Sequence, residues 1–463
     1  MSSFPRQDQV RKVAGFGGWQ SADGYVVEPE SIEELQEILV WAAKHRRKIA
    51  LRGSGRSYGD AAILPEEIVL STANLNRMEF DSQSGIVTAE AGVTLEDIWR
   101  MCLPHGFWPP VVSGTMFPTV GGMLAMNIHG KNAYHAGPIG EHVRELAVLK
   151  TSGEMVQLTP DDELFYHVIS GAGLVGIIVS AKIQMKKVPS GDLIVTPISC
   201  RNWEEQFAAF DSFAEADYCV TWIDAFATGS NQGRGQFHAG LAADGGPETL
   251  QPAHQDLPSK MGGLVPKSEA WRILKLLNRR PMMKLVNSLK HLGGKWSGDR
   301  KEFRQSLVAF SFLLDYMPNW QRAYEPDGFI QYQVFVPRER ASEVFGKIIT
   351  ECQNRKWEPF LAVMKRHRID RFLFTHGVDG YSLALDFKVI PARWNELQSM
   401  IYELNDLVTR AGGKFYFAKD STLRPEDVRS AWGEEVITQF QKSKNEFDPQ
   451  GLLETSLSRR ILI

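Results

Sequence analysis

One glycine-rich segment restricts the fold of this chain more than any other feature. Gly53-Ser54-Gly55-Arg56-Ser57-Tyr58-Gly59-Asp60 directly follows the short apolar run 49–52, which has the pattern of a β-strand. Glycine carries no Cβ, so backbone N–H groups of this turn can converge on a pyrophosphate. The spacing differs from the Rossmann G-x-G-x-x-G motif, and no clear helix follows. Taken alone, such a segment is more often an ordinary tight turn than a phosphate site.

A second glycine-rich region changes that balance. It contains Ser113-Gly114-Thr115, then Thr119-Val120-Gly121-Gly122, then the stretch 127–132. Strand-like runs and a predicted helix at 94–102 separate it from the first segment. Two glycine-rich loops that bracket one strand and helix unit can hold opposite sides of an extended dinucleotide. Residues 111–140 show little other periodicity, so we expect a long functional loop there.

These motifs resemble a known family. The stretches GSGRSYGD, TVGG and NIHGKN are similar to the flavin lobe of the vanillyl-alcohol-oxidase-type (PCMH-type) FAD-binding oxidoreductases. Within that family they look most like the decaprenylphosphoryl-beta-D-ribose 2-oxidase branch, the flavoprotein half of an epimerase. Matches at 320–324, 328–333, 415–421 and 448–460 extend the resemblance over nearly the whole chain.

The resemblance implies an α+β fold with two lobes, a PCMH/VAO-type FAD-binding domain and an antiparallel-sheet substrate or cap domain. Residues 1–190, completed by 412–463, are expected to form the FAD-binding domain, and 191–411 the substrate-binding domain. The residues favour two lobes independently, because 463 residues exceed what one core usually organises. Longer aromatic strands also begin in the predicted second domain.

Hydrophobic periodicity predicts individual elements as well. A helix is expected within 31–50 with Ser31 as its N-cap, and a second at 163–169 between two strands. Alternating apolar residues predict strands at 68–72, 85–93, 146–153, 176–185, 217–227, 328–337 and 380–390, and helical spacing predicts helices at 339–355 and 392–411.

The resemblance assigns FAD contacts to a set of matching positions. They are Gly53, Ser54, Gly55, Arg56, Ser57, Tyr58, Gly59, Asp60, Gly114, Thr119, Val120, Gly121, Gly122, Asn127, His129, Ile178 and Tyr416. Arg56 stands where many relatives have a histidine bonded covalently to the flavin, and arginine cannot form that link. The second loop also lacks the cysteine that some relatives use, so we predict FAD that is bound non-covalently.

Three residues are candidates for the chemistry of alcohol oxidation. Lys419 matches the family lysine that faces the substrate, and Tyr58 and His129 match positions beside the flavin ring. A lysine made neutral by burial can accept the hydroxyl proton, whereas a charged lysine can polarise the hydroxyl or pair with phosphate. Without the surrounding motif, Lys419 would be read as a solvated surface lysine, and Tyr58 and His129 as packing residues.

The substrate lobe contributes further candidates. Gln331, Gln333 and Lys365, together with Lys419, match substrate-binding positions of the family and can bind sugar hydroxyls or a phosphate oxygen. Alternatively, Gln331 and Gln333 mark only the polar face of the strand FIQYQVFV. The reaction needs no metal ion, and no cluster with metal-ligand spacing is evident.

Two inserts stand apart from the predicted domains. The stretch near 241–263 is rich in glycine, proline and polar residues and is expected to be flexible. The stretch 270–301 carries nine Lys and Arg residues against only Asp299, a local charge of +8, with leucines and methionines between the cations. That pattern fits a peripheral membrane contact on anionic lipid, or a helical lid whose apolar face covers the cleft.

Global composition limits the partners and the compartment. The formal net charge of −3 offers no general attraction for nucleic acid. The four cysteines lie far apart and suggest no disulfide framework, and no apolar leader is evident, so a cytoplasmic protein is expected, peripheral at the inner face of the plasma membrane if the insert binds lipid.

The favoured function is FAD-dependent oxidation of a secondary alcohol group of a sugar. The resemblance implies that this group is C2 of a polyprenylphosphoryl-ribose, which becomes a keto sugar. An NAD(P)H-dependent reductase acting on the keto product would complete the epimerisation. The alternative is a soluble alditol, aldonolactone or free-sugar oxidase or dehydrogenase on the same flavin lobe. A flavin-binding sensor without turnover is a third class, against which the joint presence of Tyr58, His129 and Lys419 argues.

Overall fold

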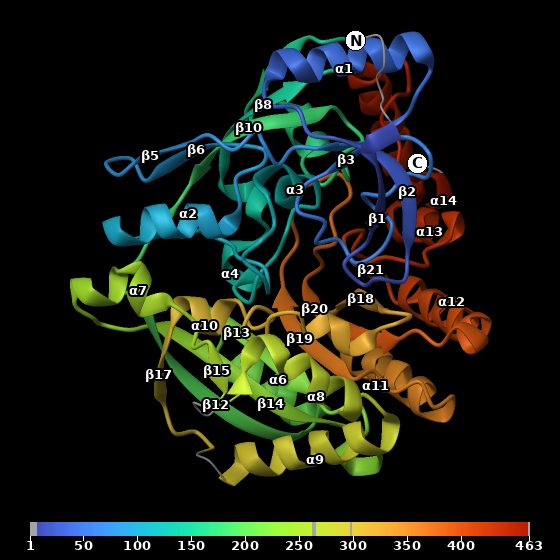
Figure 1. Ribbon diagram of the computed structural model, residues 1–463. Helices are drawn as coiled ribbons and strands as arrows, with labels where there is room; N and C mark the ends of the chain where they lie inside the picture. The colour runs from blue at the N-terminus through green and yellow to red at the C-terminus, as the bar shows by residue number, and fades with distance from the viewer. Residues whose placement is uncertain (1–6, 262–264, 297–298, 462–463) are drawn as a thin grey trace.

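A computed structural model defines the structure of residues 7–261, 265–296 and 299–461. Figure 1 shows small sheets and the N-terminal helix in the upper part of the molecule and one large twisted sheet in the lower part. Helices and sheets are segregated rather than alternating, so the fold is α+β as predicted.

The first sheet is built from the N-terminal residues and has the order β1-β2-β4-β3. Its strands are β1 (Val10–Ala14), β2 (Ser21–Val27), β3 (Ile49–Arg52) and β4 (Ile68–Ser71). Strand β4 runs parallel to both β2 and β3, and the glycine-rich segment 53–60 begins directly after β3.

The predicted helix at the start of the chain is confirmed as α1 (Ile32–His45). The Ser31 side chain accepts a hydrogen bond from the Glu34 backbone N–H at 3.2 Å, so Ser31 is the N-cap. Apolar residues at helical spacing pack α1 onto β3 and β4. The helix ends where Arg46 adopts a left-handed conformation.

A five-stranded sheet follows, with the order β5-β6-β10-β8-β9. Its strands are β5 (Met78–Asp81), β6 (Ile86–Glu90), β8 (Val143–Leu149), β9 (Met155–Leu158) and β10 (Ile177–Gln184). The predicted helices are confirmed as α2 (Leu95–Cys102) and α5 (Glu163–Val168). Strands β5 and β9 were not predicted, because they are short edge strands with half-exposed, partly polar residues. The strands β7 (Phe107–Trp108) and β11 (Lys186–Lys187) form a separate short ribbon.

The expectation of a long loop at 111–140 is wrong in part, since α3 (Val120–Ala125) and α4 (Ala133–Ala136) lie within it. Sequence periodicity missed α3 because glycine is a poor helix former in isolation. Here Gly121 packs against β6 and its following turn, and a Cβ at this position would lie 3.1 Å from the Cβ of Ala91. The helix therefore depends on close packing rather than on helix propensity.

The large sheet has eight strands in the order β17-β12-β14-β13-β19-β20-β18-β21. They are β12 (Asp192–Asn202), β13 (Tyr218–Ile223), β14 (Gly233–Ala242), β17 (Phe303–Ser306), β18 (Phe329–Pro337), β19 (Leu361–His367), β20 (Gly380–Lys388) and β21 (Lys414–Phe415). Neighbouring strands of this sheet are antiparallel throughout. Strand β21 lies beyond position 412, so the returning segment first joins this sheet before it reaches the upper part.

Helices cover one face of this sheet. They are α6 (Trp203–Ser212) and α11 (Arg338–Asn354), with α12 (Trp394–Arg410) packed beside α11. The buried side of α11 carries Ala341, Val344, Phe345 and Ile348 at helical spacing. The opposite face is turned toward the upper part of the molecule (Figure 1) and carries the polar residues described below.

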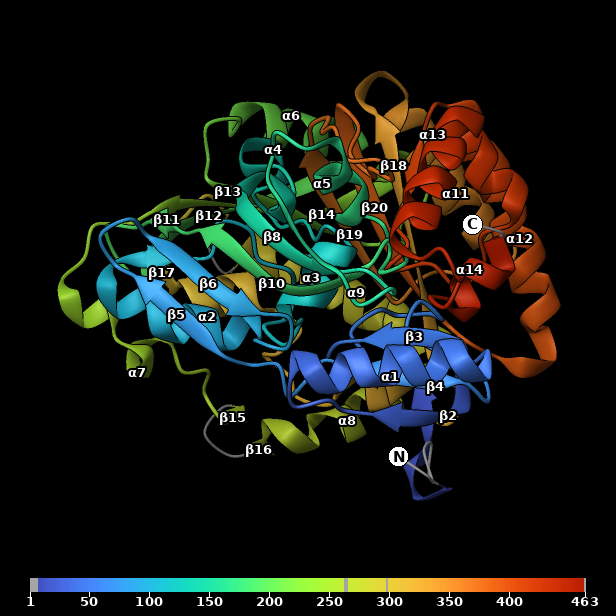
Figure 2. The same cartoon turned by 90° about the horizontal axis from the view of Figure 1, so that it is seen from above.

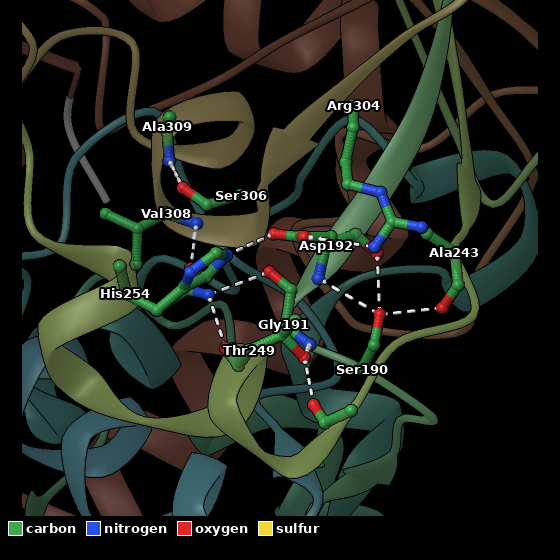
Figure 3. Close-up of polar contacts among 12 residues, drawn as sticks. Ser190, Gly191, Asp192, Ala243, Thr249, His254, Arg304, Ser306, Val308 and Ala309 are labelled. Carbon is green, nitrogen blue, oxygen red and sulfur yellow. Dashed lines mark hydrogen bonds and ion pairs between the residues drawn. The ribbon is translucent and has the colours of Figure 1, made fainter.

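The insert near 241–263 was expected to be flexible, and hydrogen bonds hold its first part against β12 (Figure 3). It contains α7 (Pro252–Gln255) and the short strand β15 (Lys260–Met261), and β16 (Val265–Pro266) follows it. The Gln255 amide nitrogen donates to the Gly191 carbonyl oxygen at 2.8 Å, and its amide oxygen accepts from the Val308 N–H in α10 (Leu307–Ser311) at 3.1 Å. His254 contacts the Asp192 carboxylate at 2.8 Å. Composition alone gave no sign of these contacts.

The insert at 270–301 is helical, with α8 (Ala270–Leu277) and α9 (Arg280–Trp296). The chain ends in α13 (Pro425–Phe447), which is broken at Gly433, and α14 (Ser456–Ile461). Figure 2 shows α12, α13 and α14 gathered on one side of the molecule. Among the described helices, none has the length and apolar character needed to cross a membrane.

Candidate active site

A large cavity lies between the two parts of the molecule, with a volume of about 1270 Å³. It exceeds the roughly 300–1,000 Å³ of a pocket for one small ligand, so it has room for an extended cofactor and a substrate together. The glycine-rich segments and the returning segment near 416–419 line one part of it. Residues of β13, β14, β18, β19 and β20 line the other part.

The two glycine-rich segments meet at the upper end of this cavity. A Cβ on Gly53 would lie 2.1 Å from the Thr119 hydroxyl oxygen, so only glycine fits there. Gly55 has φ of +67°, and a Cβ on it would also collide with the Arg52 guanidinium. The structure thus brings together the two loops that the sequence separates.

Several polar atoms at this end have no partner among the described residues. They include Arg56 Nε and His129 Nδ1, both of them buried. Burial lowers the pKa of both the Arg52 and Arg56 guanidinium groups, and Arg56 lies over the Phe117 ring at 4.7 Å. Because unsatisfied buried donors are costly, these groups and the glycine cradle fit an anionic dinucleotide such as FAD.

Most of the predicted FAD positions line the cavity: Gly53, Ser54, Gly55, Arg56, Ser57, Tyr58, Gly114, Thr119, Gly121, Gly122, His129, Ile178 and Tyr416. Four predicted positions lie behind its wall. Val120 is fully buried in the core, and Asn127 accepts a hydrogen bond from the Gly140 N–H at 2.9 Å. Gly59 and Asp60 contact the C-terminal segment instead, where a Cβ on Gly59 would meet the Asp420 carbonyl oxygen at 1.9 Å.

The returning segment brings Lys419 to Tyr58. The Tyr58 N–H donates to the Ala418 carbonyl at 2.8 Å, and Lys419 Nζ lies 3.5 Å from the centre of the Tyr58 ring. Arg460 fixes this arrangement, because its guanidinium bridges the carboxylates of Asp60 at 2.9 Å and Asp420 at 2.8 Å. Two of the predicted catalytic residues are therefore in contact.

A buried carboxylate stands beside them that the sequence did not single out. Asp386 of β20 is 1% exposed, and its Oδ1 accepts a hydrogen bond from the Gln331 amide at 2.5 Å. Burial raises the pKa of Asp386 and lowers that of Lys419, while the charge of each opposes the shift of the other. A usable signal existed: Asp386 interrupts the otherwise apolar strand SLALDF.

His129 belongs to a cluster of buried imidazoles. Its Nε2 lies 3.0 Å from the Gln333 amide nitrogen, and its ring centre lies 4.9 Å from that of His367 and 5.0 Å from that of His376. Burial, reinforced by the charge of Lys365, holds the pKa of His129 well below its ordinary value. The ring is therefore neutral near pH 7, and its unpartnered Nδ1 is free to contact a ligand. Sequence reasoning missed His367 and His376.

Strand register explains why the substrate-lobe residues share one surface. Gln331 pairs with Asp386, Gln333 with Ala384, and Lys365 with Ser382. Since paired residues of antiparallel strands point to the same side, these side chains share one face of the sheet. Gln331, Gln333, Lys365 and Ala384 line the cavity. Gln331 and Gln333 are 8% and 5% exposed, so they do not form a solvent-facing polar stripe.

The cavity is also lined by a group of half-buried cations, Lys131, Lys365 and Lys419. Lys365 lies near Lys419, and burial, followed by the charge of Lys365, lowers the pKa of Lys131. Lys131 Nζ donates to the carbonyl oxygens of Phe310 and Ser311, while Lys365 has no hydrogen bond or ion pair among the described residues. Burial lowers the pKa of Lys365 to about 8. Seven Lys and Arg residues line the described cavity, against Glu302 as its single carboxylate.

Comparisons with known proteins agree with this geometry. Residues 24–159 match the family model for an FAD binding domain. The chain is 31% identical to the decaprenylphosphoryl-beta-D-ribose oxidase of Mycolicibacterium smegmatis, covering 100% of this chain and 99% of that protein. It is also 26% identical to the D-arabinono-1,4-lactone oxidase of Yarrowia lipolytica, over 44% of this chain and 42% of that protein. A D-lactate dehydrogenase of Archaeoglobus fulgidus is 29% identical over 35% of this chain and 38% of its own.

Proposed function

Because the chain belongs to the family of FAD-dependent oxidoreductases that contains decaprenylphosphoryl-beta-D-ribose oxidase, we propose that it oxidises C2 of a polyprenylphosphoryl-ribose. The product is a keto sugar, and the step is the first half of an epimerisation. An NAD(P)H-dependent reductase acting on that keto sugar completes the inversion. The cofactor is FAD, and the group that is oxidised is a CH–OH group.

The group of cations that lines the cavity is the observation that carries this proposal. Lys131, Lys365 and Lys419 all line the cavity, and the charge of Lys365 acts on both of the others. Lys365 has no carboxylate partner among the described residues. Burying an unpaired ammonium group is unfavourable unless an anion joins it. A phosphoryl group attached to the sugar supplies that anion, whereas a free sugar or an alditol does not.

The residues around the reacting carbon divide the work. FAD, when bound, supplies the acceptor for the hydride that leaves the carbon. Lys419 takes the hydroxyl proton at Nζ, because burial lowers its pKa and makes the neutral amine accessible. Burial raises the pKa of Tyr58 well above its ordinary value, so its phenol stays protonated and donates a hydrogen bond. Gln331, Gln333 and the neutral His129 orient the sugar hydroxyls.

The rival function is oxidation of a soluble alditol, aldonolactone or free sugar. It draws support from the lactone oxidase relative, which matches less than half of this chain. The two functions differ in whether turnover requires the phosphoryl group.

One spectroscopic experiment separates them. The purified holoenzyme is mixed anaerobically with a polyprenylphosphoryl ribofuranose, with free ribose or with an alditol, and the visible flavin band is recorded. We expect bleaching with the phosphoryl-linked sugar alone. Bleaching by free ribose or the alditol at similar concentrations would establish the rival function, and a yellow protein that no sugar reduces would remove the proposed substrate.

A further inference from the structure

Helix α9 is oriented with its apolar side toward solvent. Met282, Leu285, Leu289 and Leu292 repeat at helical spacing and form one stripe, and they are 40%, 52%, 58% and 48% exposed. A surface helix of a folded domain normally buries such a stripe. Figure 1 shows α9 along the lower edge of the large sheet, at the opposite end of the molecule from α1.

Polar contacts hold α9 in this orientation. Near its start, Arg280 Nε donates to the Glu358 carboxylate at 2.7 Å. Asn287, which is 3% exposed, donates to Asp224 at 3.3 Å, and the adjacent Ser288 accepts from Arg234 at 3.1 Å. These polar contacts leave the apolar stripe on the outside, so the stripe does not cover the cavity as a lid would.

Helix α8 extends the same surface. Ile273 and Leu276 are 46% and 70% exposed, whereas Trp271 is buried beneath Arg322 at 4.2 Å. We call the six exposed apolar residues of α8 and α9 the outer face: Ile273, Leu276, Met282, Leu285, Leu289 and Leu292. Both helices also border the cavity, through Leu274 of α8 and through Lys290 and Gly294 of α9.

The segment that carries the outer face has charged residues of one sign only. Between positions 270 and 294 the chain has six Lys and Arg residues and no Asp or Glu. Arg272, Lys275 and Arg280 pair with carboxylates at the margin, and Arg279 and Lys284 have no ion pair among the described residues. A cationic border around leucine and methionine complements the headgroups and acyl chains of an anionic bilayer.

We propose that the outer face rests on an anionic lipid bilayer and holds the adjoining cavity against the membrane surface. A protein interface is less consistent with the outer face, because it has no Tyr, Trp or Phe to serve as an anchor. The proposal rests on the proposed function for one point only, that the substrate carries a polyprenyl chain embedded in the same bilayer.

Vesicle flotation of the holoenzyme tests the contact without any substrate. Vesicles of equal parts phosphatidylcholine and phosphatidylglycerol should carry the protein upward, and pure phosphatidylcholine vesicles should carry much less. The double variant Leu285→Ser/Leu289→Ser should weaken partitioning about tenfold or more. Val40→Ser on α1, where Val40 is 67% exposed, is the matched control and should float as the native protein does.

The outcomes separate this inference from the proposed function. Both variants keep the cavity residues, so reduction by a short-chain, water-soluble phosphoryl sugar should match that of the native protein. Equal flotation of native protein and double variant would overturn the bilayer contact, whatever the substrate. A dimer in analytical ultracentrifugation that the double variant abolishes, without vesicle binding by the native protein, would assign the outer face to a second copy of the chain and also overturn it.

Discussion

The side-chain amide of Gln331 donates a hydrogen bond to the carboxylate of Asp386 at 2.5 Å, across the paired strands β18 and β20. This bond holds one carboxylate oxygen, while the other has no partner among the described residues. Asp386 raises the pKa of Lys419 and so opposes the effect of burial. The protonation state of Lys419, the proposed base, thus depends on Asp386 of β20.

Replacing Asp386 by Asn should move the pH dependence of flavin reduction. Loss of the negative charge lowers the pKa of Lys419 further, so the neutral amine persists to lower pH. Because the reaction needs the neutral amine, the acid limb of the pH–rate profile should shift toward lower pH by roughly one unit or more. Stopped-flow reduction across a pH series measures this shift. The control variant Asp370→Asn removes a buried carboxyl near Lys414 instead and should leave the acid limb of the profile in place. If the acid limb does not move in Asp386→Asn, the electrostatic coupling between Asp386 and Lys419 is refuted.

Replacing Lys419 by Met should slow flavin reduction by about 100-fold or more, because a positioned general base contributes roughly that much. The visible spectrum should remain that of a fully loaded flavoprotein. Lys414→Met is the control, since Lys414 lies on β21 and does not line the cavity. Comparable reduction rates in the Lys419 variant and the native protein would exclude Lys419 as the base.

Replacing Lys365 by Gln should raise KM for a phosphoryl-linked sugar about tenfold, with a much smaller change in kcat, because a charge-assisted hydrogen bond is lost. In the native protein, kcat/KM should fall as pH rises through about 8, where Lys365 loses its proton. The variant should lack this fall. Lys347→Gln, on the exposed side of α11, should change neither quantity, and an unchanged KM in Lys365→Gln would remove the phosphoryl contact.

Replacing Gly53 by Ala should yield protein with little bound FAD, because the added Cβ would lie 2.1 Å from the Thr119 hydroxyl oxygen. The ratio of absorbance at the flavin band to that of the protein measures occupancy after purification. Gly293→Ala is the matched control: nothing lies within 4 Å of a Cβ there, and alanine favours the helix. Full occupancy in Gly53→Ala would show that the cradle can widen.

Local sequence signals predicted the elements that local forces determine. Ser31 before an apolar periodic stretch predicted α1 and its cap, and the long aromatic strands predicted β13, β18 and β20. Family motifs placed Tyr58 and Lys419 in one site, and the structure brings these two residues into contact. The FAD and substrate roles assigned to individual residues remain predictions.

Residues that depend on long-range register escaped prediction. Asp386 becomes significant only because β20 pairs with β18, and His367 and His376 reach His129 only through the packing of distant segments. The polarity of the 270–301 insert was visible in the sequence, but not which side of α9 would face the sheet. That orientation depends on Asp224 and Glu358, which belong to other elements.

The bridge from Arg460 to Asp60 joins residues 400 positions apart, and Lys419 reaches Tyr58 only through the same closing segment. The order of synthesis on the ribosome therefore matters. A growing chain can form its first sheet and its glycine-rich turn early. It still lacks Lys419, the proposed base, and Arg460, which fixes the closing segment in place. The site can close only after the C-terminal helices have emerged, so we expect the unfinished chain to lack the proposed activity.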